Sequence, residues 1–194
     1  VWDIADLPDW VMPNSVFSYQ ELAALPVIKK LATTVGAIVQ PAMDADTITV
    51  QPRYKVAPWD LATATVDRTI HENQILSEGG ALVSNAKING VFVSGESEGV
   101  GLNVSRQGTA GDVLGADVVD AWLSAIEANT SRGRAEIAAT ADRINHSLEL
   151  AIPESSAQPG LLMPGMIVEV QFNNASKNYR GYVQNNAISV PGRG

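Results

Sequence analysis

The sequence predicts an α+β fold, with a helix-and-sheet domain over residues 1–145 and a small antiparallel β-barrel-like domain over residues 146–194. Three observations lead to this prediction: two segments with apolar residues at helical spacing, several short runs that alternate apolar and polar residues, and Pro/Gly-rich turns between these runs. Hydrophobic residues make up 45% of the 194 positions, which is enough to bury a core.

The first helix has clear start and stop signals. Ser18 and Glu21 match the Ser-x-x-Glu capping box, and apolar residues recur at helical spacing over 22–35. Pro26 predicts a kink, or a restart with proline in the first turn, and Gly36 is placed to end the helix.

Short strands follow this helix. Residues 37–40 and 47–51 predict a β-hairpin around a turn at 41–46. Residues 91–94 and 100–106 predict a second antiparallel pair. Between these pairs, in segment 53–84, Pro52 and Pro58 favour extended chain, and Gly79-Gly80 predicts a loop.

A second helix is predicted from a capping box at Ser124 and Glu127 to about Asn145. Gly133 in its middle costs about 1 kcal/mol relative to alanine, so a close neighbour is expected there. The alternation then returns to a period of two, which predicts a small antiparallel sheet or partial barrel. Its four strands are expected at 148–152, 166–172, 179–183 and 188–190.

The charge and composition exclude several classes of partner. The chain has 13 basic and 21 acidic residues and a net charge of −8, which disfavours nucleic acid and anionic membranes. Arg132, Arg134 and Arg143 on the second helix are expected to form a solvated face. The chain has no cysteine, which fits synthesis in a reducing cytoplasm, and no apolar run long enough to span a bilayer.

One motif resembles a hydrolase nucleophile. Gly95-Glu96-Ser97-Glu98-Gly99 matches Gly-x-Ser-x-Gly, and Asp120 or Asp142 with His146 would complete the order of a triad. That motif requires a helix after the serine, whereas Val100–Val104 has the pattern of a strand. We therefore predict a hairpin turn and no catalytic residue.

The remaining polar residues predict no metal and no cofactor. His71 and His146 lack the spacing of a metal pair, and His146 is expected at a helix end, where it can contact exposed carbonyls. The acidic residues Asp112, Asp117 and Asp120 fit a solvated loop.

Tryptophan is enriched at protein interfaces, and Trp59 directly follows the extended chain predicted from Pro52 and Pro58. We predict Trp59 as an interface residue, together with Tyr54 and Arg106.

Eight phrases in order resemble a family of tailed-phage tail proteins related to baseplate hubs. They are Val35-Gly36-Ala37-Ile38-Val39-Gln40-Pro41, Thr47-Ile48-Thr49-Val50-Gln51-Pro52-Arg53-Tyr54, Ala57-Pro58-Trp59-Asp60, Asn89-Gly90-Val91-Phe92-Val93-Ser94-Gly95, Arg106-Gln107-Gly108-Thr109-Ala110-Gly111-Asp112, Arg132-Gly133-Arg134-Ala135, Met163-Pro164-Gly165-Met166-Ile167-Val168-Glu169-Val170 and Arg180-Gly181-Tyr182-Val183. The resemblance implies a helix-and-sheet domain followed by a barrel-like domain. It also implies a ring-forming hub, commonly trimeric, at the junction of tail tube and puncturing device, without catalytic or cofactor residues.

The expected function is therefore a non-catalytic structural component of a phage or prophage tail, as a baseplate hub or tail-tip assembly module. Its expected partners are other tail proteins and two further copies of itself, and its expected location is the virion tail. The chain opens on Val1 and has no evident barrel before Phe17, so we expect it to be a piece of a longer protein. Two alternatives stay open, a carbohydrate- or receptor-binding tail module and, less favoured, a serine hydrolase.

Overall fold

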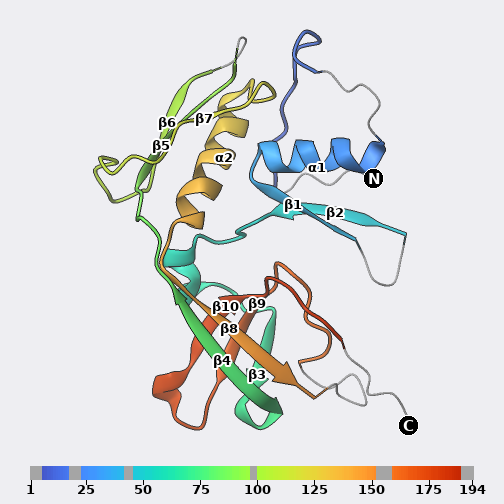
Figure 1. Cartoon of the computed structure of the whole chain (residues 1–194), viewed down its shortest axis with the longest axis vertical. Coiled ribbons are helices and arrows are strands. Elements are labelled where there is room, and N and C mark those ends of the chain that lie inside the picture. Colours follow the sequence, from blue (N-terminus) through green and yellow to red (C-terminus); the bar gives the residue numbers. More distant parts are fainter. Residues whose placement is uncertain (1–5, 18–22, 42–45, 97–99, 152–158, 189–194) are drawn as a thin grey trace. The chain divides into compact units, whose positions relative to one another are not determined.

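A computed structural model describes residues 6–17, 23–41, 46–96, 100–151 and 159–188 (Figure 1). It has a mixed α+β fold, which confirms the predicted fold class. The chain divides into two compact units, the first formed by Val1–Pro58 and Ser84–Asp142 and the second by Trp59–Val83 and Arg143–Gly194. Each unit is described by itself.

The first helix of the first unit is α1, Ala24–Thr34. Pro26 lies in its first turn, as predicted, where its missing N–H breaks no helical hydrogen bond. Gly36 follows the helix with a φ of +71°, a conformation that glycine adopts without strain, and so ends it as predicted. The predicted capping box at Ser18 and Glu21 lies outside the described residues.

After α1 the chain forms the predicted hairpin. Strand β1, Ala37–Pro41, pairs antiparallel with β2, Ile48–Pro52. The second predicted strand pair is also present, because β5, Gly90–Ser94, pairs antiparallel with β6, Leu102–Ser105. A short strand, β7, Val118–Val119, adds in parallel to the other edge of β5.

Helix α2, Ile126–Ala139, packs against β5 and β6 (Figure 1). The predicted capping box is wrong, because the N-cap is Ala125 and Ser124 Oγ donates instead to the carbonyl of Val11 at 3.2 Å. The predicted helix end at Asn145 is also wrong, because the chain leaves the helix at Thr140 and enters a strand at Arg143.

The close neighbour predicted at Gly133 is Val104 on β6. A Cβ atom on Gly133 would lie 2.5 Å from Val104 Cγ2 and 2.6 Å from its Cβ, so the helix approaches the sheet as closely as it does only because the side chain is a hydrogen. Nearby, the fully buried Asn129 donates from Nδ2 to the carbonyls of Val93, at 3.2 Å, and Val100. Together these residues fix the position of α2 on the sheet.

The second unit is built around strand β9, Ile167–Gln171. Strand β10, Tyr179–Tyr182, pairs antiparallel with one edge of β9, and β3, Arg68–His71, pairs parallel with the other. The buried centre is formed by Ile70, Val168 and Val170. Three short 3₁₀ helices connect the strands, η1 (Pro58–Thr63), η2 (Glu72–Gln74) and η3 (Ala175–Lys177).

The same unit contains a two-stranded ribbon of β4, Ile75–Val83, and β8, Arg143–Leu150, which pair antiparallel. The loop predicted at Gly79-Gly80 is wrong, because both glycines lie inside β4, opposite Ser147 and His146. Pairing with β8, more than 60 positions away, supplies the hydrogen bonds that local propensity does not predict.

The second unit also differs from prediction in how its strands close. The described strands of this unit form a three-stranded sheet and a separate two-stranded ribbon, and β3 runs parallel to β9. The pairings of these strands do not close them into the predicted barrel. Ile188 is not in a strand, and the rest of the fourth predicted strand lies outside the described residues. The two observed units differ from the predicted division at residue 145 in one segment. Trp59–Val83 belongs to the second unit, because its strands β3 and β4 pair with the carboxy-terminal segment.

The contact between Gly133 and Val104 gives a direct test of the packing. We expect Gly133→Ala to lower the free energy of unfolding by about 1–3 kcal/mol, because the added methyl group overpacks the helix–sheet contact. Adding Val104→Ala should recover about 1 kcal/mol relative to the sum of the single variants, measured in a urea double-mutant cycle. A Gly133→Ala variant more stable than wild type, as helix propensity alone predicts, would contradict this packing.

Candidate functional site

The best-connected polar cluster lies in the first unit, around the buried side chain of Trp122. Trp10 Nε1 donates to the carbonyl of Trp122 at 3.1 Å, and the ring of Phe17 lies 5.3 Å from the Trp122 ring at an angle of 34°. The amino-terminal segment is thereby attached to the loop that precedes α2.

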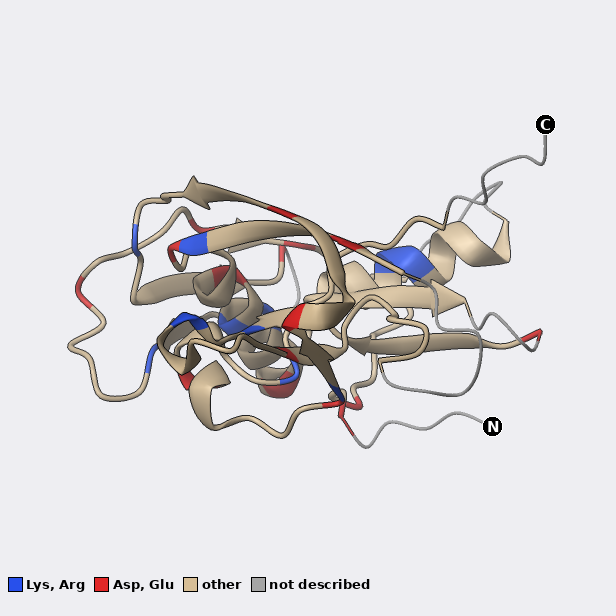
Figure 2. Ribbon diagram, turned by 90° about the horizontal axis from the view of Figure 1, so that it is seen from below, with Lys and Arg blue, Asp and Glu red and all other residues tan. Residues whose placement is uncertain are grey.

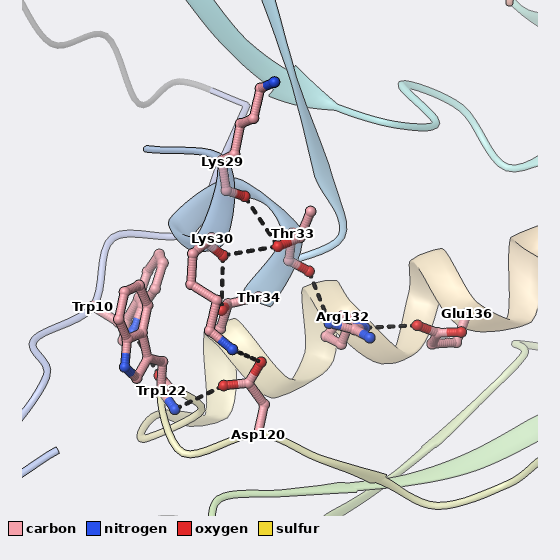
Figure 3. Close-up of polar contacts among 9 residues, drawn as sticks. All are labelled: Trp10, Lys29, Lys30, Thr33, Thr34, Asp120, Trp122, Arg132 and Glu136. Carbon is pink, nitrogen blue, oxygen red and sulfur yellow. Dashed lines mark hydrogen bonds and ion pairs between the residues drawn. The ribbon is translucent and has the colours of Figure 1, made fainter. Parts of the chain in front are cut away.

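Asp120 connects this loop to α1 (Figure 3). Its Oδ2 lies 3.1 Å from Lys30 Nζ, and its Oδ1 accepts from the backbone N–H of Trp122 at 3.0 Å. Lys30 Nζ is also 5.4 Å from the centre of the Trp122 ring. The prediction of a solvated loop is wrong for Asp120, because its side chain is only 14% exposed.

A second connection joins α2 to the carboxyl end of α1. Arg132 Nη1 donates to the carbonyl of Thr33 at 2.8 Å, while its Nε contacts Glu136 Oε1 at 2.6 Å (Figure 3). Ser131 Oγ donates to the carbonyl of Val35 at 2.8 Å. A helix end has carbonyls without helical partners and a partial negative charge, and a guanidinium group stabilises both. Arg132 is therefore an anchor rather than part of the predicted solvated face.

This cluster holds elements together and has no evident chemistry. Each charged group in it contacts another side chain or a backbone group of the same unit. None of these groups is arranged as a nucleophile beside a base. The contacts of the described residues in this cluster therefore have a structural role, which is to hold elements of the first unit together.

The second unit has a smaller polar cluster on the β4–β8 ribbon. His146 stacks on Tyr179 with ring centres 3.9 Å apart and an interplanar angle of 16°. Both residues contact Glu78 Oε1, the Nδ1 atom of His146 and the hydroxyl of Tyr179 each at 3.3 Å. The predicted place of His146 at a helix end is wrong, because Arg143–Leu150 is a strand.

Burial raises the pKa of the Tyr179 hydroxyl well above its ordinary value of 10.0, and the neighbouring Glu78 carboxylate raises this pKa further. Both effects favour the neutral phenol, since ionisation would place a second negative charge beside Glu78 in a partly buried site. The cluster therefore fastens the ribbon to β10.

The ribbon also exposes large apolar side chains. Leu76 is 65% exposed, Leu82 73% and Ile144 57%. In the part of the chain that the structure describes, β4 and β8 pair only with each other, so each strand has one edge without a neighbouring strand. Exposed apolar residues beside an unpaired edge are typical of an interaction surface.

The three predicted interface residues do not form one group. Tyr54 and Arg106 belong to the first unit and Trp59 to the second, and all three are partly buried. The guanidinium carbon of Arg53 lies 5.7 Å from the ring centre of Tyr54, and the backbone of Arg106 forms a turn with Thr109. Their role in an interface remains a prediction.

Trp59 lies in η1, which Arg180 fixes in place. Arg180 Nη1 donates to the carbonyls of Ala62 at 2.6 Å and Ala64 at 3.1 Å, while its Nε contacts Glu169 Oε1 at 2.9 Å. The hydrogen bond from the Arg180 guanidinium is the main cause that holds the pKa of the Glu169 carboxyl below its usual range. The hydrogen bond from the Gln171 amide lowers this pKa further. This link between β10, β9 and η1 had no signal in the sequence beyond an arginine in a strand.

Residues 95–99, which match Gly-x-Ser-x-Gly, lie between strands β5 and β6 in the sequence. Ser97 lies outside the described residues, but the segment after it contains strand β6 and not the helix that a nucleophile elbow requires. In the described ranges, no group of three or more His, Cys, Asp or Glu could hold a metal ion. No helix in these ranges is both long and apolar enough to cross a membrane.

Lysine and arginine are scattered over several elements rather than gathered on one strand or helix (Figure 2). With a net charge of −8, this distribution gives none of the described elements the basic stripe that a phosphate backbone requires.

The Tyr179 pKa predicts a pH dependence of stability. Its raised pKa in the folded state means that the unfolded chain loses this proton at lower pH, so the free energy of unfolding should fall as pH rises above about 10. We expect a smaller fall for Tyr179→Phe and an intermediate one for Glu78→Gln, measured by urea titrations at pH 8 to 11. Equal slopes for wild type and Tyr179→Phe would contradict the assignment.

Comparisons with known proteins address the fold. No protein-family model matches the sequence, and no curated protein matches it. The solved structures that match include two tail proteins. The tail protein from Neisseria meningitidis MC58 has a TM-score of 0.50 and 12% identity over 82% of this chain and 48% of that one. The prophage tail protein gp18 from Listeria monocytogenes EGD-e has a TM-score of 0.43 and 13% identity over 82% of this chain and 46% of that one.

The chain thus spans about half the length of each of these solved structures. At these identities the likeness concerns the fold alone. The resemblance to tail proteins predicted from the sequence is confirmed at that level, because this chain has the fold of a segment of the Neisseria tail protein.

Proposed function

We propose that this chain is a non-catalytic structural module of a tailed-phage or prophage tail. The observation that carries the proposal is the fold shared with the Neisseria meningitidis tail protein over 82% of this chain. The order of the eight sequence phrases supports the same function independently of the coordinates. The polar clusters at Trp122 and Tyr179 also support it, because their contacts join structural elements.

Within the tail, we propose a place in the baseplate hub or tail tip, as one of three copies in a ring. The sequence resemblance supports this finer proposal. The exposed apolar residues of the β4–β8 ribbon show that a described surface is suited to contacts with other proteins. Trp59, Tyr54 and Arg106 are the residues that we propose for contacts with neighbouring tail proteins.

The receptor- or carbohydrate-binding alternative would use exposed tryptophans as a platform. In the described residues, Trp122 is buried and Trp10 uses its indole N–H to hold the Trp122 carbonyl. Two of the four tryptophans are therefore committed to internal packing, which favours the assembly module.

The tail proposal predicts where the protein is found. We expect antibodies against this chain to label one end of the tail in purified phage particles, and mass spectrometry to detect the chain in tails and not in DNA-filled heads separated from them. Labelling of free cell protein with none on particles would contradict the proposal. Labelling along the whole tail would retain a tail role but exclude the hub.

The ring proposal predicts the number of copies in contact. Cross-linking of purified tails should give a band at three times the mass of one protein, a product that a two-fold contact alone cannot generate. Trp59→Ala should reduce this band if Trp59 lies in the contact, whereas Val119→Ala, at an exposed apolar position, serves as the control. Products that end at two copies would contradict a trimer.

A further inference from the structure

Asn89, directly before strand β5, holds the loop 106–113 that follows strand β6. Its Nδ2 donates to Asp112 Oδ1 at 3.0 Å, and its Oδ1 accepts from the backbone N–H of Val113 at 2.8 Å. Its backbone binds the same loop, because its N–H donates to the carbonyl of Val113 at 2.9 Å and its carbonyl accepts from the N–H of Arg106 at 2.8 Å. One asparagine thus fastens both ends of this loop.

The residue after Asn89 is a glycine because the packing leaves no room for a side chain. A Cβ atom on Gly90 would lie 2.9 Å from the carbonyl oxygen of Gly111 and 2.9 Å from Leu114 Cδ2. The contact therefore explains why an Asn-Gly pair stands at this point of the chain. It is the only Asn-Gly pair in the sequence.

An asparagine followed by glycine is chemically vulnerable. The backbone nitrogen of the glycine can attack the side-chain carbonyl carbon of the asparagine, and the side-chain nitrogen leaves as ammonia after it takes the proton of the glycine N–H. The cyclic imide that remains is opened by water to aspartate or isoaspartate. Glycine favours the first step, because it has no side chain to hinder the approach and its backbone is free to adopt the required conformation.

The folded loop opposes this first step by holding both reacting groups. The N–H of Gly90 donates to the carbonyl of Val113 at 3.2 Å, so the attacking nitrogen is engaged. The side-chain amide of Asn89 is fixed by Asp112 on one side and by the N–H of Val113 on the other, so it cannot turn toward that nitrogen. The reaction therefore requires a local opening of the loop, which is a normal motion of folded proteins.

We propose that Asn89 is a deamidation site that the closed loop 106–113 protects, and that its conversion to aspartate or isoaspartate releases this loop irreversibly. The aspartate product has no N–H to donate to Asp112, and it places a second carboxylate where an amide now lies 3.0 Å from the first. Two negative charges at that distance repel each other. The isoaspartate product also adds a carbon atom to the main chain before Gly90.

The charge of Asp112 makes the released state favourable after the reaction. The hydrogen bond from the Asn89 amide is the main cause that holds the pKa of the Asp112 carboxyl below its ordinary value of 3.8. Asp112 is therefore ionised near neutral pH and accepts from this amide as a carboxylate. Once the amide is lost, the loop loses a donor and gains a repulsion at the same point.

The first test measures the reaction itself. The protein is kept in mildly alkaline buffer, folded or in concentrated urea, and peptide mass spectrometry follows aspartate and isoaspartate at position 89. We expect the reaction to be at least about tenfold slower in the folded protein than in urea. Asn103 and Asn145, which no glycine follows, serve as internal controls and should convert much more slowly in urea. Equal rates at Asn89 in both conditions, or no conversion in urea, would overturn the proposal.

A variant tests whether the Asp112 contact provides the protection. Asp112→Ala removes the acceptor of the Asn89 amide, so deamidation of the folded protein should become at least about threefold faster. Asp117→Ala is the matched control, because it removes a charge from another exposed position before β7, and it should leave the rate unchanged. Both variants should react like wild type in urea, where the loop is absent. A folded rate that Asp112→Ala leaves unchanged would overturn the protective role of the loop.

The last test measures the effect of the product. Asn89→Asp should make hydrogen exchange of the Arg106 N–H, which donates to the Asn89 carbonyl, at least about fivefold faster. Adding Asp112→Asn exchanges the positions of amide and carboxylate at the same net charge, and should restore the rate to within about twofold of wild type. Wild-type exchange in Asn89→Asp, or no restoration in the double variant, would overturn the proposed release. None of these outcomes depends on the proposed role in a phage tail.

Discussion

The first unit depends on the close approach of α2 to strand β6. Gly133 permits this approach because a larger residue would overlap Val104, and Asn129 secures it by donating to two sheet carbonyls. Once α2 is fixed, its neighbouring side chains Ser131 and Arg132 reach the carbonyls at the end of α1. These contacts together determine where the first helix, and the hairpin that follows it, can lie.

The second unit depends instead on strand pairing between distant segments. The parallel pairing of β3 with β9 is completed at its start by Asp67, whose backbone N–H donates to the carbonyl of Ile167 while its Oδ2 accepts from the N–H of Ile167, both at 2.8 Å. Arg180 then extends the connection to η1. These contacts explain why Trp59–Val83 groups with the carboxy-terminal segment.

The functional interpretation follows from which groups are used internally. The charged and aromatic residues around Trp122 and Tyr179 are bound to each other and to backbone groups within their own units. Among the features left accessible in the described residues are the exposed apolar side chains of the β4–β8 ribbon and the unpaired edges of its strands. Exposed apolar residues beside unpaired strand edges are suited to contacts with other proteins.

The sequence by itself determined the features that depend on neighbouring residues. The end of α1 at Gly36, proline in its first turn and the β1–β2 and β5–β6 hairpins all follow from local backbone preferences. Gly133 also predicted a close contact, because a glycine inside a helix is unfavourable unless a neighbour requires it.

Only the tertiary structure decided the features that depend on distant partners. Gly79-Gly80 has the composition of a loop but lies in a strand, since β8 supplies its hydrogen bonds, and this same pairing ends α2 before Asn145. The partners of Asp120, Arg132 and His146 likewise come from distant segments. The pairs are His146–Tyr179, Lys30–Asp120 and Arg132–Thr33, and the two residues of each pair are 33 to 99 positions apart. Local periodicity and propensity contain no information on such pairings, because they arise only when the whole chain has folded.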